Sequence, residues 1–206
     1  MEKAKRKERE FNLRRAEILE NAEKIFAVKG FYNATVAEIA GASGFAVGTI
    51  YQFFESKEQL YAALLTEKLK MLYEGIRKAV GQETGVFRKI EVLAASNFRF
   101  VEDNAAFCSI FIRGDHLSLS EGSEALRTRI MGDYAEYVSF IENVIREGIQ
   151  TGDLKKMDPR MMASALIGII NSCSFRWLTV SKDGSLETKV PFVMDIFLEG
   201  VRQHAH

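Results

Sequence analysis

Residues 35–60 read TVAEIAGASGFAVGTIYQFFESKEQL, a pattern typical of two short helices joined by a tight turn. Thr35 and Glu38 have the spacing of a capping box, in which the threonine hydroxyl accepts a backbone amide proton and the glutamate carboxylate reaches back. This cap predicts a helix over residues 36–42, and the turn signal at Ser43-Gly44 ends it. Because apolar residues then resume at helical spacing, the segment predicts a helix-turn-helix.

A helix-turn-helix cannot bury its apolar side chains alone, so the segments on either side must supply partner helices. Upstream, apolar residues follow the i, i+3, i+4 rule and stop at Gly30, which predicts a first helix with a glycine C-cap. Downstream, Ser56 and Gln59 predict the N-terminal cap of a fourth helix that continues to about Val80.

The remainder of the chain also has helical periodicity, and no stretch sustains a period of two. We predict further helices over residues 86–104, 105–113, 121–151, 159–181 and 186–203. The last two are rich in apolar residues, and the first of these two is apolar on two faces. We therefore predict that they pack inward on one face and against a second copy of the chain on the other, a buried monomeric core being the alternative. The protein is predicted to be all-α, with about nine helices.

The chain has 206 residues, 47% of them hydrophobic, and a formal net charge of zero. The charge is uneven, because residues 1–15 contain seven lysines and arginines against three glutamates, a balance of 7 − 3 = +4. Such a basic arm favours contact with an anionic surface, although a solvated helix start has the same composition. No apolar run approaches the roughly 20 residues of a membrane span, and no signal region follows the charged N-terminus. We predict a cytoplasmic protein without a membrane segment.

The block TVAEIAGASGFAVGTIYQFFESKEQLYAAL resembles the DNA-binding segment of TetR-type transcriptional regulators. A threonine-capped second helix, a G-T-[IL]-Y core and an F-x-S-K-E-x-L exit recur in that family, and the similarity is close over residues 12–65. The resemblance implies a DNA-binding domain over residues 1–57, with the helix-turn-helix at about 35–54. Residues 58–206 would form an effector-binding and dimerisation domain joined to it by the fourth helix.

The resemblance also implies which residues contact DNA. Base edges would be met by Val47, Gly48, Thr49 and Gln52, and phosphates by Thr35, Tyr51 and Lys57. The chemistry agrees, since valine and threonine methyls suit thymine and a glutamine amide can pair with adenine. Ala46 and Phe53 depart from the family pattern, because neither side chain can form a hydrogen bond there. We therefore expect affinity to depend more on the basic arm, whose arginines could enter a minor groove.

A phenylalanine-rich segment, FRFVEDNAAFCSIF over residues 98–111, lies where such regulators form a ligand cavity. The predicted apolar lining, with its one amide, comprises Phe98, Val101, Phe107, Cys108, Phe111, Asn171 and Phe175, and the predicted polar contacts are Arg113, His116 and Arg176. Aromatic residues at helical spacing also fit a plain core, so this interpretation stays open. The lining would suit an apolar or aromatic effector, with one acidic group as an optional feature.

We therefore predict a homodimeric repressor that a small, largely apolar effector releases from a palindromic operator. The alternative is a DNA-binding protein of the same fold without an effector, acting through a protein partner or in chromosome organisation. The sequence has no phosphate-binding glycine loop, no metal-spaced histidines and no recognisable nucleophile signature, so we expect no enzyme activity, metal or cofactor. Cys108 and Cys173 are predicted core residues, and no metal site is predicted for His204 and His206.

Overall fold

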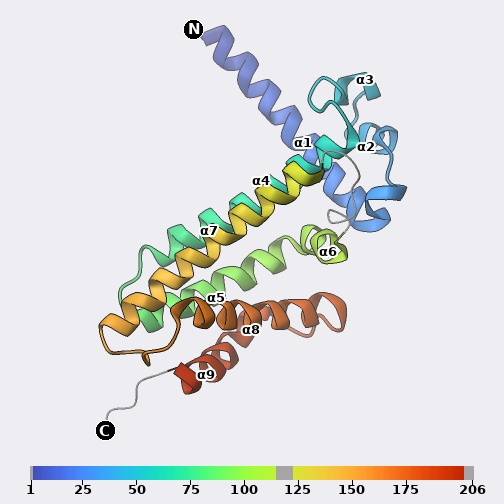
Figure 1. The fold of residues 1–206 in the computed structure, drawn as a ribbon. Coiled ribbons are helices and arrows are strands. Elements are labelled where there is room, and N and C mark those ends of the chain that lie inside the picture. The colour runs from blue at the N-terminus through green and yellow to red at the C-terminus, as the bar shows by residue number, and fades with distance from the viewer. Residues whose placement is uncertain (1, 115–122, 202–206) are drawn as a thin grey trace. The chain divides into compact units, whose positions relative to one another are not determined.

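The computed structural model describes residues 2–114 and 123–201, and this part of the chain contains helices and no strands (Figure 1). The elements are α1 (Glu2–Asn33), α2 (Val36–Ala42), α3 (Val47–Ile50), α4 (Lys57–Val80), α5 (Val86–Asp103), α6 (Ala105–Arg113), α7 (Ser123–Gln150), α8 (Pro159–Thr179), the 3-10 helix η2 (Leu186–Lys189) and α9 (Val190–Val201). The all-α prediction is confirmed, and the predicted bounds of α2 and α6 agree with the structure.

The described residues divide into two compact units. The N-terminal unit contains residues 2–68 and the described part of 106–127, and the C-terminal unit contains 69–105 and 128–201. Helix α4 therefore contributes to both units, and the division falls inside it rather than at its start. Almost all of α6 also belongs to the N-terminal unit, which a division of the chain into two continuous segments does not anticipate.

The core of the N-terminal unit is built from one face of each of its helices. Phe26 of α1, Ile39 of α2 and Ile50 of α3 are buried, and the Phe26 ring packs edge-on against Tyr61 of α4 at a centroid distance of 5.0 Å. Gly30 lies within α1 with φ 76° and ψ 170°, a conformation that glycine adopts without a Cβ clash. The predicted stop at Gly30 is thus a kink, after which the chain continues to Asn33.

In the recognition segment, residues 47–54, the helix is shorter than the apolar pattern indicates. Helix α3 ends at Ile50, and the following amides make turn bonds, from Gln52 to the Thr49 carbonyl at 3.1 Å and from Phe53 to the Ile50 carbonyl at 3.0 Å. Ala46 provides no side-chain cap, because its methyl group cannot accept a hydrogen bond. One helical turn followed by tight turns therefore presents the predicted DNA contacts.

The C-terminal unit is organised around α5, which packs against α8, α9 and η2. Asp158 accepts a hydrogen bond from the Met161 amide at 2.8 Å, so α8 begins as predicted, with Pro159 in its first turn. The predicted last helix is divided into η2 and α9, and the Glu102 carboxylate accepts the Leu186 amide proton at 2.5 Å where η2 begins.

Helix α8 is the one described helix long and apolar enough to meet the criterion for a membrane span. A third of its apolar window is buried, and core helices of water-soluble proteins satisfy the same criterion. This finding is weak evidence for a membrane segment.

Candidate DNA interface and effector region

The start of α2 is held by the predicted capping box. The Thr35 hydroxyl accepts from the Glu38 amide at 3.2 Å, and the Glu38 carboxylate accepts from the Thr35 amide at 3.0 Å. The same carboxylate also accepts the Thr35 hydroxyl proton at 3.0 Å and is paired with Lys29. The Lys29 ammonium and the two Thr35 bonds lower the pKa of Glu38. A phosphate contact through the Thr35 hydroxyl therefore requires that proton to turn away from Glu38.

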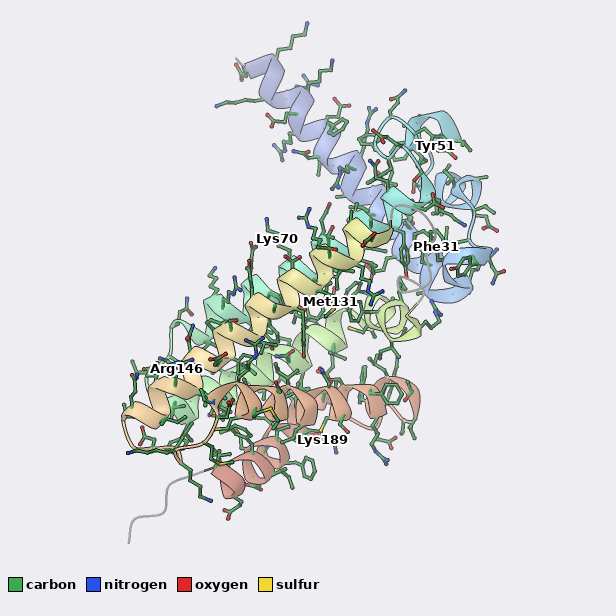
Figure 2. The ribbon with its side chains drawn as sticks, in the orientation of Figure 1. Phe31, Tyr51, Lys70, Met131, Arg146 and Lys189 are labelled. Atoms are coloured by element: carbon green, nitrogen blue, oxygen red, sulfur yellow. The ribbon has the colours of Figure 1, made fainter. Side chains whose placement is uncertain are left out.

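The residues predicted to meet DNA form an exposed surface on the recognition segment. Val47 is 40% exposed and Tyr51 is 51% exposed, while Gly48 and Gln52 are also exposed and Thr49 is half-buried. Figure 2 shows Tyr51 beside α3. On the opposite side of the same segment Ile50 and Phe54 are buried and pack into the core of the unit. Five of the seven predicted DNA contacts thus lie on this one segment.

Lys57 has a structural role that the sequence did not reveal. Its ammonium donates to the Phe31 carbonyl at 2.9 Å and to the Ala34 carbonyl at 3.0 Å, and it lies 4.4 Å from the centroid of the Phe31 ring. These carbonyls end α1 and lead into α2, where helical partners are lacking. Two of the three ammonium protons therefore join α4 to the α1–α2 connection, and one is left for a phosphate.

The residues predicted to line an effector cavity are divided between the two units. Phe98 is buried and Val101 half-buried in the C-terminal unit, whereas Phe107, Cys108 and Phe111 belong to the N-terminal unit. A second group lies on the exposed face of α8: Asn171, Phe175 and Arg176. Since exposed side chains cannot line a cavity inside the unit, this group is better placed to meet another molecule. His116, also predicted, lies outside the described residues.

Arg113 contacts backbone in the structure. Its two terminal nitrogens donate to the Ala27 carbonyl at 2.7 Å and to the Phe26 carbonyl at 2.5 Å, just before the kink at Gly30. The end of α6 is thereby attached to α1 within the N-terminal unit. Because these bonds engage the guanidinium, the effector site proposed below does not include Arg113.

Cys108 is a partly buried thiol near a charged pair. Burial, with a smaller contribution from the Glu23 carboxylate, raises its pKa to about 12, and the Lys68 ammonium opposes the change. Lys68 and Glu23 form an ion pair at 2.8 Å. Since the thiolate is the reactive form, this raised pKa keeps Cys108 in the less reactive thiol form at neutral pH.

The C-terminal unit contains a buried polar pair that was not predicted from the sequence. The Asn97 amide nitrogen donates to the Tyr137 hydroxyl at 2.9 Å and to the Leu93 carbonyl at 3.0 Å, and Tyr137 stacks on Tyr73 with ring centroids 4.6 Å apart. Burial raises the pKa of both tyrosines. The available signal was a single polar residue, Asn97, on the apolar stripe of α5.

Tyr73 also borders a polar groove between α4 and α7. The groove has a volume of about 230 Å³ and is lined by Lys70, Tyr73, Glu74, Arg77, Arg129, Asp133 and Glu136. Within it, the buried Nε of Arg77 has no hydrogen-bond partner among the described residues, and the terminal Nη2 of the same guanidinium lies 3.6 Å from a carboxylate oxygen of Glu136. Three cationic and three acidic side chains therefore line the groove beside the buried tyrosines, and one of the cations, Arg77, is incompletely paired.

The turn-linked pair α2 and α3, its exposed recognition segment and the separate helical unit define a helix-turn-helix DNA-binding regulator. The profile described as "Bacterial regulatory proteins, tetR family" matches residues 18–64, and "Tetracyclin repressor-like, C-terminal domain" matches residues 88–200. The chain therefore belongs to the TetR family, whose members are transcription regulators rather than enzymes.

Similar proteins include the fatty acid metabolism regulator of Bacillus subtilis strain 168, which is 23% identical over 193 residues, covering 90% of this chain and 94% of the relative. The solved structure of the regulator FadR from Bacillus subtilis in complex with stearoyl-CoA superposes with a TM-score of 0.77 at 22% identity, covering 90% and 98% of the two chains. The nucleoid occlusion factor SlmA of Marinomonas sp. strain MWYL1 is 26% identical over 160 residues, 77% of this chain and 80% of that protein.

Proposed function

We propose that this TetR-family protein is a dimeric repressor that leaves a palindromic operator when a long-chain fatty acyl-CoA binds its C-terminal unit. The observation that carries the effector class is the buried Asn97–Tyr137 pair beside the polar groove. An apolar interior with one polar end, next to cationic side chains, suits an amphiphile with a long chain and an anionic head group. The fatty acid metabolism regulator among the similar proteins supports the same class.

The proposed dimer forms through α8 and α9. Both helices keep large apolar side chains on their exposed faces: Met161 at 69%, Phe175 at 53%, Phe192 at 54% and Ile196 at 54% exposure. Gly168 and Ser172 lie on the exposed side of α8, where small residues let another helix approach closely. A two-fold dimer requires a palindromic operator with half-sites about 34–36 Å apart, and binding takes place in the cytoplasm, where the chromosome lies.

Gln52→Ala should relax the base preference of the operator at one position in each half-site. A glutamine amide that pairs with adenine contributes about 1–3 kcal/mol of discrimination between bases, which the alanine methyl cannot supply. Selection from random-sequence DNA, carried out with both proteins, measures the change position by position. Glu55→Gln is the matched control, since loss of that exposed charge should affect all sequences alike. An unchanged preference in the alanine variant would exclude Gln52 from base contact.

Stearoyl-CoA should release the protein from its selected operator, whereas coenzyme A alone and stearate alone should be much weaker. The thioester ligand supplies both the buried chain and the anionic head group, and each fragment supplies one. Complete release requires the ligand to favour the released conformation by about 10⁴-fold, so loss of either part should be visible. Fluorescence anisotropy with labelled operator measures release, and native mass spectrometry measures ligand bound per dimer. If acyl-CoA failed to release the protein from its operator at every chain length tested, the proposed effector class would be contradicted.

A second candidate function is DNA binding without an effector, which the similarity to a nucleoid occlusion factor favours. In that case operator binding would persist at saturating acyl-CoA, and no ligand mass would be retained. The anisotropy and mass measurements therefore separate the two functions on one protein sample.

A further inference from the structure

The first part of α1, residues 2–10, is a basic helix whose five cations have no ion-pair partner among the described residues. Its exposed cations are Lys3, Lys5, Arg6, Lys7 and Arg9, and the described residues offer none of them an ion pair. By contrast, Arg14 pairs with Glu10 at 2.9 Å and Arg15 with Glu67 at 2.5 Å. In Figure 1 this part of α1 extends beyond α2 and α3 as a single helix. The N-terminal unit thus presents a charged rod rather than a flexible arm.

An aromatic contact attaches this basic helix to the recognition segment. The rings of Phe11 and Phe53 lie 4.4 Å apart between centroids, although Phe11 remains 47% exposed. One turn further along α1, the Arg15 guanidinium lies 5.2 Å from the Phe54 ring centroid. Phe53 and Phe54 directly follow the residues that face DNA, so the direction of the basic helix is fixed relative to them.

We propose that the basic helix, residues 2–10, binds the phosphate backbone of operator DNA flanking each half-site, and that Phe11 and Phe53 position it there. The inference rests on the proposed function, because it requires that the recognition segment binds an operator. An α-helix is about 10–12 Å wide with its side chains, and the minor groove is only about 6 Å wide. The helix therefore lies along phosphates instead of inserting an extended arm into that groove.

The basic helix is already ordered before DNA binds. This explains the role of Phe53, which stands where a hydrogen-bonding residue would otherwise be expected. An isolated helix shorter than about 12–15 residues is marginal in water, so an unattached arm would have to become ordered on DNA. As a continuation of the buried part of α1, held by two aromatic rings, the helix needs no nucleation and loses little entropy on binding. Phe53 thus replaces one local phosphate contact by positioning several cations on flanking DNA.

The test compares two duplexes, one ending at the last selected base pair and one extended by ten base pairs at each end. Binding is measured by fluorescence anisotropy across a salt series for the unsubstituted protein, for the fivefold variant Lys3→Gln, Lys5→Gln, Arg6→Gln, Lys7→Gln, Arg9→Gln, and for Phe11→Ala. Leu13→Ala is the matched control, since Leu13 is 61% exposed on the same helix. Circular dichroism checks that each variant is folded.

On the extended duplex, the fivefold variant should lose about 0.9 from the slope of log K against log salt for each phosphate contact removed, and about eightfold in affinity per contact at 0.1 M relative to 1 M salt. Phe11→Ala should show part of the same loss, and Leu13→Ala none. On the short duplex all four proteins should bind alike. A purely structural role for Phe11 would weaken binding to both duplexes equally, and that result would overturn its positioning role.

Equal slopes for the unsubstituted protein and the fivefold variant on the extended duplex would overturn the proposal while leaving the proposed function intact. Loss of binding to phosphatidylglycerol vesicles with unchanged operator affinity would also overturn it, by assigning the basic helix to lipid. Failure of the unsubstituted protein to select any operator would instead contradict the proposed function.

Discussion

Ile196→Glu is expected to convert the protein into a monomer and to weaken operator binding by about 10²–10⁴-fold. Ile196 is 54% exposed on α9, as is Phe192 one turn earlier. In a two-fold dimer built on this face, each glutamate would be buried without a partner, and the symmetry repeats that cost on both protomers. Binding one half-site at a time then loses the effective concentration that links the two recognition segments.

Light scattering after size-exclusion chromatography gives the mass, and anisotropy with the palindromic operator gives the affinity. Met131→Glu is the matched control, because Met131 is 58% exposed on α7 and also belongs to the C-terminal unit, yet lies outside the proposed interface (Figure 2). A dimer that survives Ile196→Glu, or one that Met131→Glu dissociates instead, would show that α8 and α9 do not form the interface.

Lys57→Met should lower the free energy of unfolding of the N-terminal unit by about 2 kcal/mol, in addition to weakening operator binding. The methionine keeps an apolar stem but cannot donate to the Phe31 and Ala34 carbonyls, and an unsatisfied buried acceptor costs about 1–3 kcal/mol. Loss of the cation over the Phe31 ring adds to the effect. Urea unfolding followed by circular dichroism measures the stability, and the salt series measures the DNA contact.

Lys24→Met is the control for this stability change. Lys24 lies on α1 and, like Lys57, belongs to the N-terminal unit, but its ion pair with Glu20 is largely exposed, and such pairs contribute about 0–1 kcal/mol. A phosphate contact alone would reduce the salt slope by about 0.9 per protomer and leave stability unchanged. That pattern in Lys57→Met would mean that the carbonyl contacts contribute nothing measurable to the fold.

The carbonyl contacts of Lys57 depend on residues far away in the sequence, whereas other features of the fold depend on neighbouring residues. The capping boxes and turn signals were sufficient for the helix-turn-helix, because a cap joins groups three or four residues apart and needs no other part of the molecule. Helix α2 therefore begins and ends where Thr35 and Ser43-Gly44 predict. The two faces of the recognition segment could likewise be assigned from periodicity, and Ile50 and Phe54 are buried accordingly.

Features that depend on how whole helices pack could not be predicted in the same way, because their partners lie far away in the sequence. Asn171, Phe175 and Arg176 are cavity residues only by the family resemblance, and the structure places them on the exposed face of α8. A helical pattern does not say which face meets its own chain. The kink at Gly30 and the division of the last helix have similar origins. At the start of η2 the Leu186 amide donates to the carboxylate of Glu102, far away in the sequence.

Sequence alone determined the fold class, the helix-turn-helix and the exposed recognition segment of this regulator, because short-range hydrogen bonds and helical periodicity are properties of neighbouring residues. Only the tertiary structure brought Phe11 against Phe53, Lys57 onto the end of α1 and Asn97 onto Tyr137. Each of these contacts joins residues far apart in the chain, and the packing of whole helices selects such a pair from many others of the same chemical type. A local sequence pattern therefore does not identify which distant residue becomes the partner.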